Sequence, residues 1–328
     1  MKKFRVLIPE FLPPGKIVMD ILSPIADIEI GLNRPYTEEE LIEKIKDVDA
    51  IIVTSREKIT KRVIEAANKL KIISKFGAGY ENIDIKAATE KNIIVTRTTA
   101  LNADAVAEFA IGLMLSLLRK IPFAMNHLKS GKWRGEETLG NDLKGKTIGI
   151  IGFGAIGSKV AMKLKGFEVR ILAYDPYVSN EKAKEIGVQL VNLETLLRES
   201  DIVTIHTALT NETRKMIGEK QLKIMKPSAY LINTARGEVI DEKALYYALK
   251  ENRIAGAALD VFEKEPPSLN NPLFQLNNII VTPHCAGSTK ETRERVLAKA
   301  AMNVVNVLEG RLPDLNDIIN PEVLNKLK

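Results

Sequence analysis

Short apolar runs alternate with amphipathic helical patterns through the first hundred residues. The apolar runs lie at 4–8, 28–30, 50–53, 72–76 and 93–96, and each has the length of a strand. Between them lie patterns with helical spacing, such as 37–45, where Thr37 and Glu40 predict a capping box at the start of a helix. Repeated strand–helix units predict a parallel sheet with helices on its faces.

A second series of the same kind begins at Lys146. Its later apolar runs lie at 169–174, 202–206, 229–233, 256–260 and 279–282. Residues 290–309 then form one long helical pattern that ends at Gly310, a residue suited to a helix C-terminus. Between the two series, the apolar stretch 102–119 fits either a buried core helix or a helix that bridges two domains and faces a second subunit.

The second series opens with a glycine-rich motif. The apolar run 147–151 leads into Gly152, Gly154 and Gly157, and an amphipathic helical pattern follows. Such glycines permit a tight turn, close approach of the backbone to a pyrophosphate, and close packing of helix on strand. Asp175 ends the next apolar run 18 residues after Gly157 (175 − 157), close to the roughly 20 expected for an acid that binds the adenosine ribose. The motif predicts a dinucleotide site, and the alternative is a strand–helix turn without a ligand.

The place of this motif predicts the domain organisation of an α/β protein. A chain of 328 residues is long for one core, and the first hundred residues lack the glycine motif. We predict a Rossmann-type NAD-binding domain over 102–286. A discontinuous, flavodoxin-like α/β substrate-binding domain is expected over 1–101 and 287–328, and the active site in the cleft between them, outside the carboxyl ends of the strands.

Composition excludes several classes of function. The 48 basic and 42 acidic residues give a net charge of +6 and are dispersed, so no nucleic-acid surface is expected. The single cysteine, Cys285, excludes an internal disulfide and a cysteine metal cluster, and the three histidines lack metal-site spacing. The apolar run at the N-terminus is too short for a signal peptide, and no run has the length of a membrane span. We therefore expect a cytoplasmic protein without a metal.

Four loops that follow apolar runs hold the candidate chemistry. In 76–80, the small residues Ala78 and Gly79 expose backbone N–H groups suited to a carboxylate, although a tight turn alone would explain them. Arg236 precedes a glycine and has a guanidinium that binds carboxylates; a surface arginine is the plain alternative. Glu265 lies on a loop stiffened by prolines, and His284 follows Pro283. A histidine has a pKa suited to acid–base catalysis, which a neighbouring Glu265 would raise; otherwise His284 is structural.

Taken together, these motifs resemble the D-isomer-specific 2-hydroxyacid dehydrogenases over essentially the whole chain. The resemblance implies that His284 exchanges a proton with the substrate, that Glu265 tunes His284, and that Arg236 holds the substrate carboxylate and polarises the carbonyl. Ala78 and Gly79 would complete the carboxylate site, and Asn102 and Asp260 would lie near substrate and nicotinamide. The motifs that carry the resemblance are the glycine turn, Asp175, 233–237, 260–266 and Pro283-His284. The cofactor contacts that it implies are Gly152, Gly154, Ala155, Ile156, Gly157, Asp175, His206, Thr207, Ala208, Thr234, Ala235, Asp260 and His284.

Cofactor and substrate can be narrowed further. Asp175 is followed by Pro176-Tyr177-Val178-Ser179, without a basic residue to meet a 2′-phosphate, which favours NAD over NADP. The stretches 173–177 and 306–310 resemble the phosphoglycerate dehydrogenase branch of the family. That branch has an Arg-Ser loop that contacts phosphate, whereas 54–58 reads Thr-Ser-Arg-Glu-Lys with the arginine displaced. Oxidation of 3-phosphoglycerate and reduction of glyoxylate or hydroxypyruvate both remain open.

The resemblance also implies a homodimer, and the helix 102–119 is the segment expected to face the second subunit. We expect no regulatory domain of the kind found in many members of the phosphoglycerate dehydrogenase branch, and hence no serine feedback. Two other classes share the fold: corepressor-like proteins that sense NAD without catalysis, and formate dehydrogenases. Arg236, Glu265 and His284 together argue against a sensor, and formate dehydrogenases have Gln in the place of Glu265.

Overall fold

The computed structural model describes residues 3–10, 16–32 and 34–325. Residues 1 and 2, which begin the basic N-terminal segment, lie outside the described residues. The chain forms two compact units, one of Met1–Asn102 with Thr289–Lys328 and one of Ala103–Ser288. The units divide at 102/103 and 288/289, where the sequence predicts limits at 101/102 and 286/287. Within the described ranges, no helix is both long enough and apolar enough to cross a membrane.

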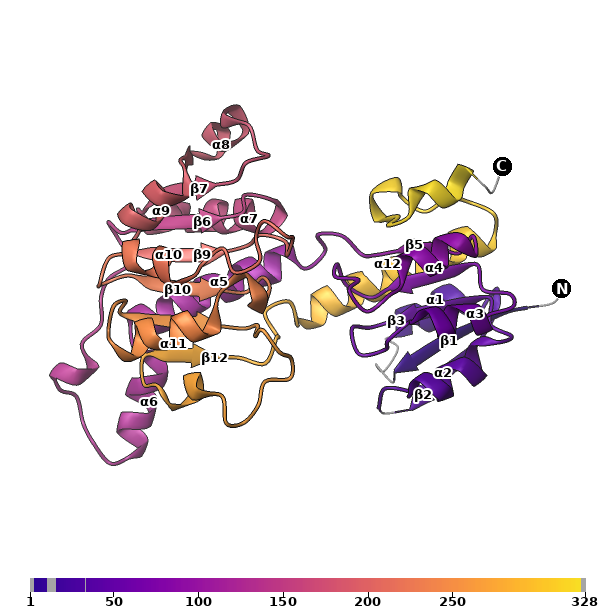
Figure 1. Ribbon diagram of the computed structural model, residues 1–328, viewed down its shortest axis with the longest axis horizontal. Helices are drawn as coiled ribbons and strands as arrows, with labels where there is room; N and C mark the ends of the chain where they lie inside the picture. Colours follow the sequence, from indigo (N-terminus) through magenta and orange to yellow (C-terminus); the bar gives the residue numbers. More distant parts are fainter. Residues whose placement is uncertain (1–2, 11–15, 33, 326–328) are drawn as a thin grey trace. The chain divides into compact units, whose positions relative to one another are not determined.

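The first unit is a parallel sheet of β1 (Phe4–Glu10), β2 (Ala26–Leu32), β3 (Ala50–Val53), β4 (Ile72–Lys75) and β5 (Ile94–Thr96). The strand order is β2-β1-β3-β4-β5, which is the flavodoxin-like order (Figure 1). Its helices are α1 (Lys16–Leu22), α2 (Glu38–Ile45), α3 (Lys61–Ala66), α4 (Ile85–Glu90) and α12 (Lys290–Leu308), with 3-10 turns η5 (Leu315–Asp317) and η6 (Pro321–Asn325).

Side chains that alternate along each strand build the two cores of this unit. In β3, Ile51 and Val53 pack on the face covered by α2, α3 and α4, whereas Ala50 and Ile52 pack on the face covered by α1 and α12. The predicted capping box is present, because Thr37 accepts from the backbone of Glu40 while Glu40 accepts from the backbone of Thr37. The fold class expected from the periodicity is therefore confirmed for this unit.

The second unit is a parallel sheet of seven strands in the order β12-β11-β10-β9-β6-β7-β8. Counted from β6, this is the Rossmann order with one added strand, and the order reverses between β6 and β9 (Figure 1). The strands are β6 (Thr147–Ile151), β7 (Arg170–Tyr174), β8 (Gln189–Leu190), β9 (Ile202–Ile205), β10 (Tyr230–Asn233), β11 (Gly256–Leu259) and β12 (Ile279–Val281).

Helices cover both faces of this sheet. The cluster on one face includes side chains of α5 (Ala103–Leu118), α7 (Ala155–Leu164) and α8 (Asn180–Ile186); the cluster on the other includes α9 (Leu193–Glu199), α10 (Glu219–Ile224) and α11 (Glu242–Lys250). The remaining elements are α6 (Ile121–Lys129) and the 3-10 turns η1 (Glu136–Thr138), η2 (Lys165–Phe167), η3 (Gly237–Val239) and η4 (Pro272–Gln275).

The apolar stretch 102–119 is a core helix. In α5, Ala107, Ala110 and Met114 are fully buried and belong to the main core of the unit. These side chains pack inside the unit rather than on its surface, and the expectation that this helix faces a second subunit stays a prediction. Exposed apolar side chains lie on α6, which extends away from the rest of the unit in Figure 1.

Candidate active site

The glycine turn between β6 and α7 has the geometry that a dinucleotide needs. Gly152 has φ +89°, and a Cβ there would lie 2.7 Å from the carbonyl carbon of His206. A Cβ on Gly157 would lie 2.1 Å from the carbonyl oxygen of Gly152. A Cβ on Gly154, in contrast, would meet nothing within 4 Å, and no side chain caps α7 there. The fold therefore requires glycine at 152 and 157, where a side chain would collide with the backbone. Gly154 leaves open space at a helix N-terminus, which suits a pyrophosphate.

Asp175 lies beside this turn at the end of β7. Its Oδ2 accepts a hydrogen bond of 2.8 Å from the backbone N–H of Phe153, and its Oδ1 accepts one of 2.9 Å from Tyr177. These contacts tie the carboxylate to the glycine turn itself. The residue expected to bind the ribose is thus held next to the residues expected to bind the pyrophosphate.

His206 follows β9, the strand next to β6. Its Nε2 lies 2.9 Å from the hydroxyl of Thr204, and its Nδ1 lies 3.5 Å from the hydroxyl of Thr234. Desolvation lowers the pKa of His206 to about 3, so the ring is neutral near neutral pH. Thr207 and Ala208 come next, and Ala235 follows Thr234 in the loop after β10. These loops leave the same edge of the sheet as the glycine turn.

His284 and Glu265 are in direct contact. The Nδ1 atom of His284 lies 2.6 Å from Oε2 of Glu265, and Oε1 of Glu265 accepts from the backbone N–H of Phe262 at 3.1 Å. The hydrogen bond to Glu265 raises the pKa of His284 and outweighs the desolvation of the ring. Burial acts to raise the pKa of Glu265, but the hydrogen bond and charge of His284 outweigh it, and the net pKa is lowered. The arrangement favours the ion pair.

The carboxylate of Asp260 is fully buried and is held by the loop that carries His284. It accepts hydrogen bonds from the hydroxyl of Thr282 at 2.6 Å and from the backbone N–H groups of Cys285 and Ala286 at 2.9 and 2.8 Å. The family resemblance implies a place for Asp260 near substrate and nicotinamide. In this structure the carboxylate accepts hydrogen bonds from three donors of its own unit. These bonds fix the loop around His284.

Arg236 lies in the turn after β10. The side-chain amide of Asn233 donates to the carbonyl oxygen of Arg236 at 2.8 Å, and Nη1 of Arg236 donates to the carbonyl oxygen of Ala235 at 2.7 Å. Its positive charge lowers the pKa of both His284 and Glu265, so the three groups share one electrostatic environment. The three candidate catalytic residues therefore come together in the second unit.

Two of the predicted substrate residues lie in the loop after β4 of the first unit. Gly77 has φ +110° and its N–H donates to Thr98 at 2.8 Å. The N–H groups of Ala78 and Gly79 have no acceptor in the described part of the chain. Two free donors in succession suit a carboxylate. Asn102, the third predicted substrate residue, ends this segment of the unit, directly before α5.

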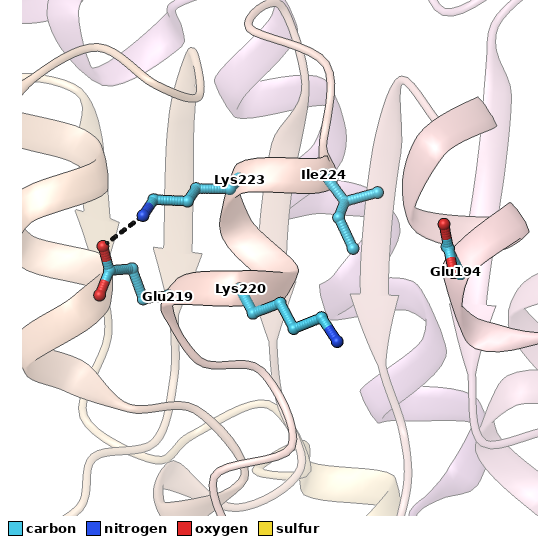
Figure 2. A pocket seen from close by; sticks show the side chains of 5 residues that line it. All are labelled: Glu194, Glu219, Lys220, Lys223 and Ile224. Carbon is cyan, nitrogen blue, oxygen red and sulfur yellow. Dashed lines mark ion pairs between the residues drawn. The ribbon is translucent and has the colours of Figure 1, made fainter.

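Outside the candidate site, the structure also has a surface pocket. The pocket drawn in Figure 2, between α9 and α10, is lined by a glutamate–lysine ion pair of 2.7 Å between Glu219 and Lys223, and by none of the candidate site residues. No group of three or more metal-ligating side chains is found among the residues that the structure describes.

Comparisons with known proteins show the family to which the chain belongs. The model of the D-isomer specific 2-hydroxyacid dehydrogenase NAD-binding domain matches residues 111–286. The chain is 45% identical to a glyoxylate reductase of Thermococcus litoralis, covering 98% of each chain. It is also 45% identical to a D-3-phosphoglycerate dehydrogenase of Archaeoglobus fulgidus over 90% of this chain, but spans only 56% of that relative.

A solved structure is similar over nearly the whole chain. The D-lactate dehydrogenase of Aquifex aeolicus, in complex with NAD and lactic acid, gives a TM-score of 0.85 at 29% identity and covers 96% of this chain and 98% of its own. A dinucleotide-binding α/β protein with a histidine–glutamate pair is thus the class that fold and site define. The chain belongs to the D-isomer specific 2-hydroxyacid dehydrogenase family.

Proposed function

We propose that this chain is an NAD-dependent D-2-hydroxyacid dehydrogenase, which interconverts a small 2-hydroxy acid and its 2-oxo acid. The observation that carries the proposal is the 2.6 Å contact between His284 and Glu265, in the same sheet unit as a glycine turn shaped for a dinucleotide. A proton donor of raised pKa and a cofactor site are the two components that the reaction requires.

The cofactor site is formed by the glycine turn, Asp175 and the loops after β9 and β10. Gly152, Gly154 and Gly157 with Ala155 and Ile156 would hold the pyrophosphate, and Asp175 the adenosine ribose. Bound there, the nicotinamide ring accepts or supplies the hydride. The further contacts proposed are His206, Thr207, Ala208, Thr234, Ala235, Asp260 and His284.

His284 moves the proton. Because Nδ1 is engaged by Glu265, Nε2 is the nitrogen that faces the substrate, and Nε2 has no partner among the described residues. In reduction, Nε2 donates its proton to the carbonyl oxygen as that oxygen gains negative charge. In oxidation, the neutral Nε2 accepts the proton of the hydroxyl. Glu265 stabilises the imidazolium that is present before reduction and after oxidation.

Arg236 and the free N–H groups of Ala78 and Gly79 are proposed to bind the substrate carboxylate. The guanidinium remains charged at every working pH and also stabilises charge that develops on the carbonyl oxygen. Asn102 is proposed to contact the substrate as well. Each of these roles stands on donor chemistry, because the carboxylate and carbonyl oxygens of a 2-oxo acid are hydrogen-bond acceptors.

NAD is proposed over NADP. Both oxygens of Asp175 already accept backbone hydrogen bonds, so the carboxylate is fixed where the 2′-phosphate of NADP would introduce a second negative group. The segment from Pro176 to Ser179 offers no arginine or lysine to neutralise it. Like-charge repulsion at this position supports the choice of NAD.

One observation favours a substrate without a phosphate, such as glyoxylate or hydroxypyruvate. Glu57, in the loop after β3, is fully buried, and its Oε2 accepts from the backbone and hydroxyl of Thr54 at 2.8 Å. Its Oε1 has no hydrogen-bond partner among the described residues. The loop where the phosphoglycerate branch carries its phosphate-binding arginine thus has a buried carboxyl group at its centre. Arg56 and Lys58 on either side of it are exposed and basic, so a phosphorylated substrate stays the alternative.

A homodimer is also proposed, with exposed apolar side chains on and after α6 as a contact. Apolar side chains on and after α6 are strongly exposed, and Trp133 reaches 75% exposure. Exposed apolar groups clustered on one projecting segment are typical of a protein interface. The other exposed members are Ile121, Phe123, Met125, Leu128 and Leu139.

The function is tested by following NADH oxidation with glyoxylate, hydroxypyruvate, pyruvate and 3-phosphohydroxypyruvate. We expect turnover with at least one of them, highest with an unphosphorylated 2-oxo acid, and a loss of about 10²- to 10⁴-fold in kcat for His284→Ala. The exposed Glu219→Ala serves as the control. No turnover with any substrate would support an NAD-sensing protein, and equal turnover by His284→Ala would remove His284 from its role.

A further inference from the structure

Two glutamates outside the candidate site bond to each other's backbone. The N–H of Glu242, the first residue of α11, donates to Oε1 of Glu263 at 3.1 Å. In return, the N–H of Glu263 donates to Oε1 of Glu242 at 2.5 Å. We call this reciprocal pair the Glu242–Glu263 clamp. It joins a helix N-terminus to a loop that lies 21 residues further along the chain.

Further groups hold the clamp from both sides. The ammonium group of Lys215 lies 3.3 Å from the carboxylate of Glu263 and 3.6 Å from that of Asp241, the N-cap of α11. The side-chain amide of Asn271 donates to Oε2 of Glu242 at 3.3 Å. Each carboxylate of the clamp therefore has a second partner, and the loop is held on α11 by side chains from separate segments.

The clamped loop is the one that carries Glu265. Glu263 lies two residues before Glu265, and the N–H of Phe262 donates to the Glu265 carboxylate. A Cβ on Gly237 would lie 1.9 Å from the carbonyl carbon of Phe262, so the turn that follows Arg236 also packs directly against this loop. Movement of the loop at 262–265 would thus change the 2.6 Å contact between Glu265 and His284.

We propose that the Glu242–Glu263 clamp positions Glu265 against His284 and thereby sets the pH range over which the protein reduces its substrate. The inference rests on the proposed function, because it assigns the clamp to the proton-transfer step. Glu242 and Glu263 are positioning residues, since they act through Glu265. The charged groups that act directly on His284 are Glu265, Arg236 and Asp260.

Release of the clamp has a predictable effect. Without it, Glu265 spends less time on Nδ1, and His284 loses its proton at a lower pH. The N–H groups of Glu242 and Glu263 lie at a helix start and in a loop, where water can replace the lost acceptor. The change should therefore appear in the pH profile more strongly than in the stability of the fold.

The test measures kcat/KM of the full chain for its best 2-oxo acid as a function of pH. In Glu263→Ala and in Glu242→Ala, we expect the decline at high pH to move about 0.5 to 1 pH unit lower. On the alkaline side of the profile, kcat/KM should therefore fall about three- to tenfold, with KM for NADH unchanged. Glu263→Gln keeps an oxygen that accepts from Glu242 and loses only the exposed charge pair with Lys215, so it should restore the native profile.

Two reference variants make the outcome decisive. Glu219→Ala removes the exposed carboxylate of the first residue of the neighbouring helix α10 and should leave the profile unchanged. Glu265→Gln should move the decline at least as far as the clamp variants. The clamp is refuted if Glu265→Gln moves the decline while both alanine variants lower only the melting temperature. If Glu265→Gln leaves the decline in place, the His284–Glu265 pair itself is refuted, and the clamp with it.

Discussion

Asp260 holds the main chain at His284 and directly after it. The N–H of His284 donates to the Asp260 carbonyl oxygen at 2.8 Å, while the Asp260 carboxylate takes the N–H groups of the next two residues. His284 has φ +51°, a left-handed conformation that non-glycine residues seldom adopt. The buried carboxylate thus fixes the backbone conformation that presents the imidazole.

Replacement of this carboxylate should destabilise the fold. Asp260→Ala leaves the donors of Thr282, Cys285 and Ala286 without their acceptor, and we expect a loss of about 3 kcal/mol in the free energy of unfolding. Urea denaturation measures it. The exposed Asp47→Ala, which breaks only a surface pair with Lys69, should change stability by less than about 0.5 kcal/mol. Equal values for the two variants would contradict the assigned role.

Reduction and oxidation should depend on pH in opposite ways. Reduction needs protonated His284, and its rate should be maximal below the pKa of His284 and decline as pH rises through it. Glu265 raises that pKa above the ordinary value of 6.5, so the decline should begin on the alkaline side of 6.5. Oxidation needs the neutral ring and should rise over the same interval. Profiles of kcat/KM in both directions test this, and parallel profiles would exclude His284 as the shared acid and base.

Asp175 should decide between the two dinucleotides. Asp175→Ala removes the ribose acceptor and the negative charge, so we expect KM for NADH to rise about tenfold, the value of one charged hydrogen bond. KM for NADPH should fall, so the ratio of kcat/KM for NADH to that for NADPH should decrease. Steady-state kinetics with each cofactor measures the ratio. A native protein that prefers NADPH would show that the cofactor assignment is wrong.

Substitutions of the glycines in the turn should have different effects on NADH binding and on the stability of the fold. Gly154→Ala places a methyl group in open space, so the melting temperature should change little while the Kd for NADH rises at least about tenfold. Gly152→Ala requires a left-handed alanine against the His206 carbonyl and should lower both stability and binding. Gly166→Ala, also in open space but outside the turn, is the control for both. Unchanged NADH binding in Gly154→Ala would argue against a pyrophosphate at this point.

The exposed side chains of α6 should control assembly. We expect the native chain to sediment as a dimer at micromolar concentration and Leu128→Glu to sediment as a monomer, because a charge replaces an apolar contact. Exposed Leu269, at 89% exposure outside this segment, gives the matched control Leu269→Glu. A native monomer would refute the homodimer, and a dimeric Leu128→Glu would move the interface elsewhere.

The sequence predicts the fold better than it predicts the contacts that hold the site residues in place. Strand positions follow from apolar runs, and the glycine turn follows from backbone chemistry that only glycine satisfies. The stretch 102–119 is apolar on nearly every side, so its pattern alone does not distinguish a core helix from an interface. The structure adds that many of its side chains belong to the core of the second unit.

The Glu242–Glu263 clamp has no comparable pattern in the sequence. Charged residues in the first turn of a helix and in a proline-rich loop are typical of a solvated surface, and their partners are backbone groups 21 residues away. The role of Asp260 is also not evident from the sequence. The family resemblance implies a place near substrate and nicotinamide, whereas in the structure its carboxylate accepts hydrogen bonds from the protein itself. Contacts between distant segments become visible only when the fold brings those segments together.

The placement of α12 has a consequence for synthesis of the protein. This helix comes from the last forty residues, yet its Leu297, Ala300 and Val304 cover the same core as Val6 and Ile52. A ribosome therefore completes the entire dinucleotide-binding unit before it delivers the helix that closes the unit it began with. Until then, α1 covers that face of the first sheet without α12, and residues of β1, among the first to emerge, are among the last to become fully buried.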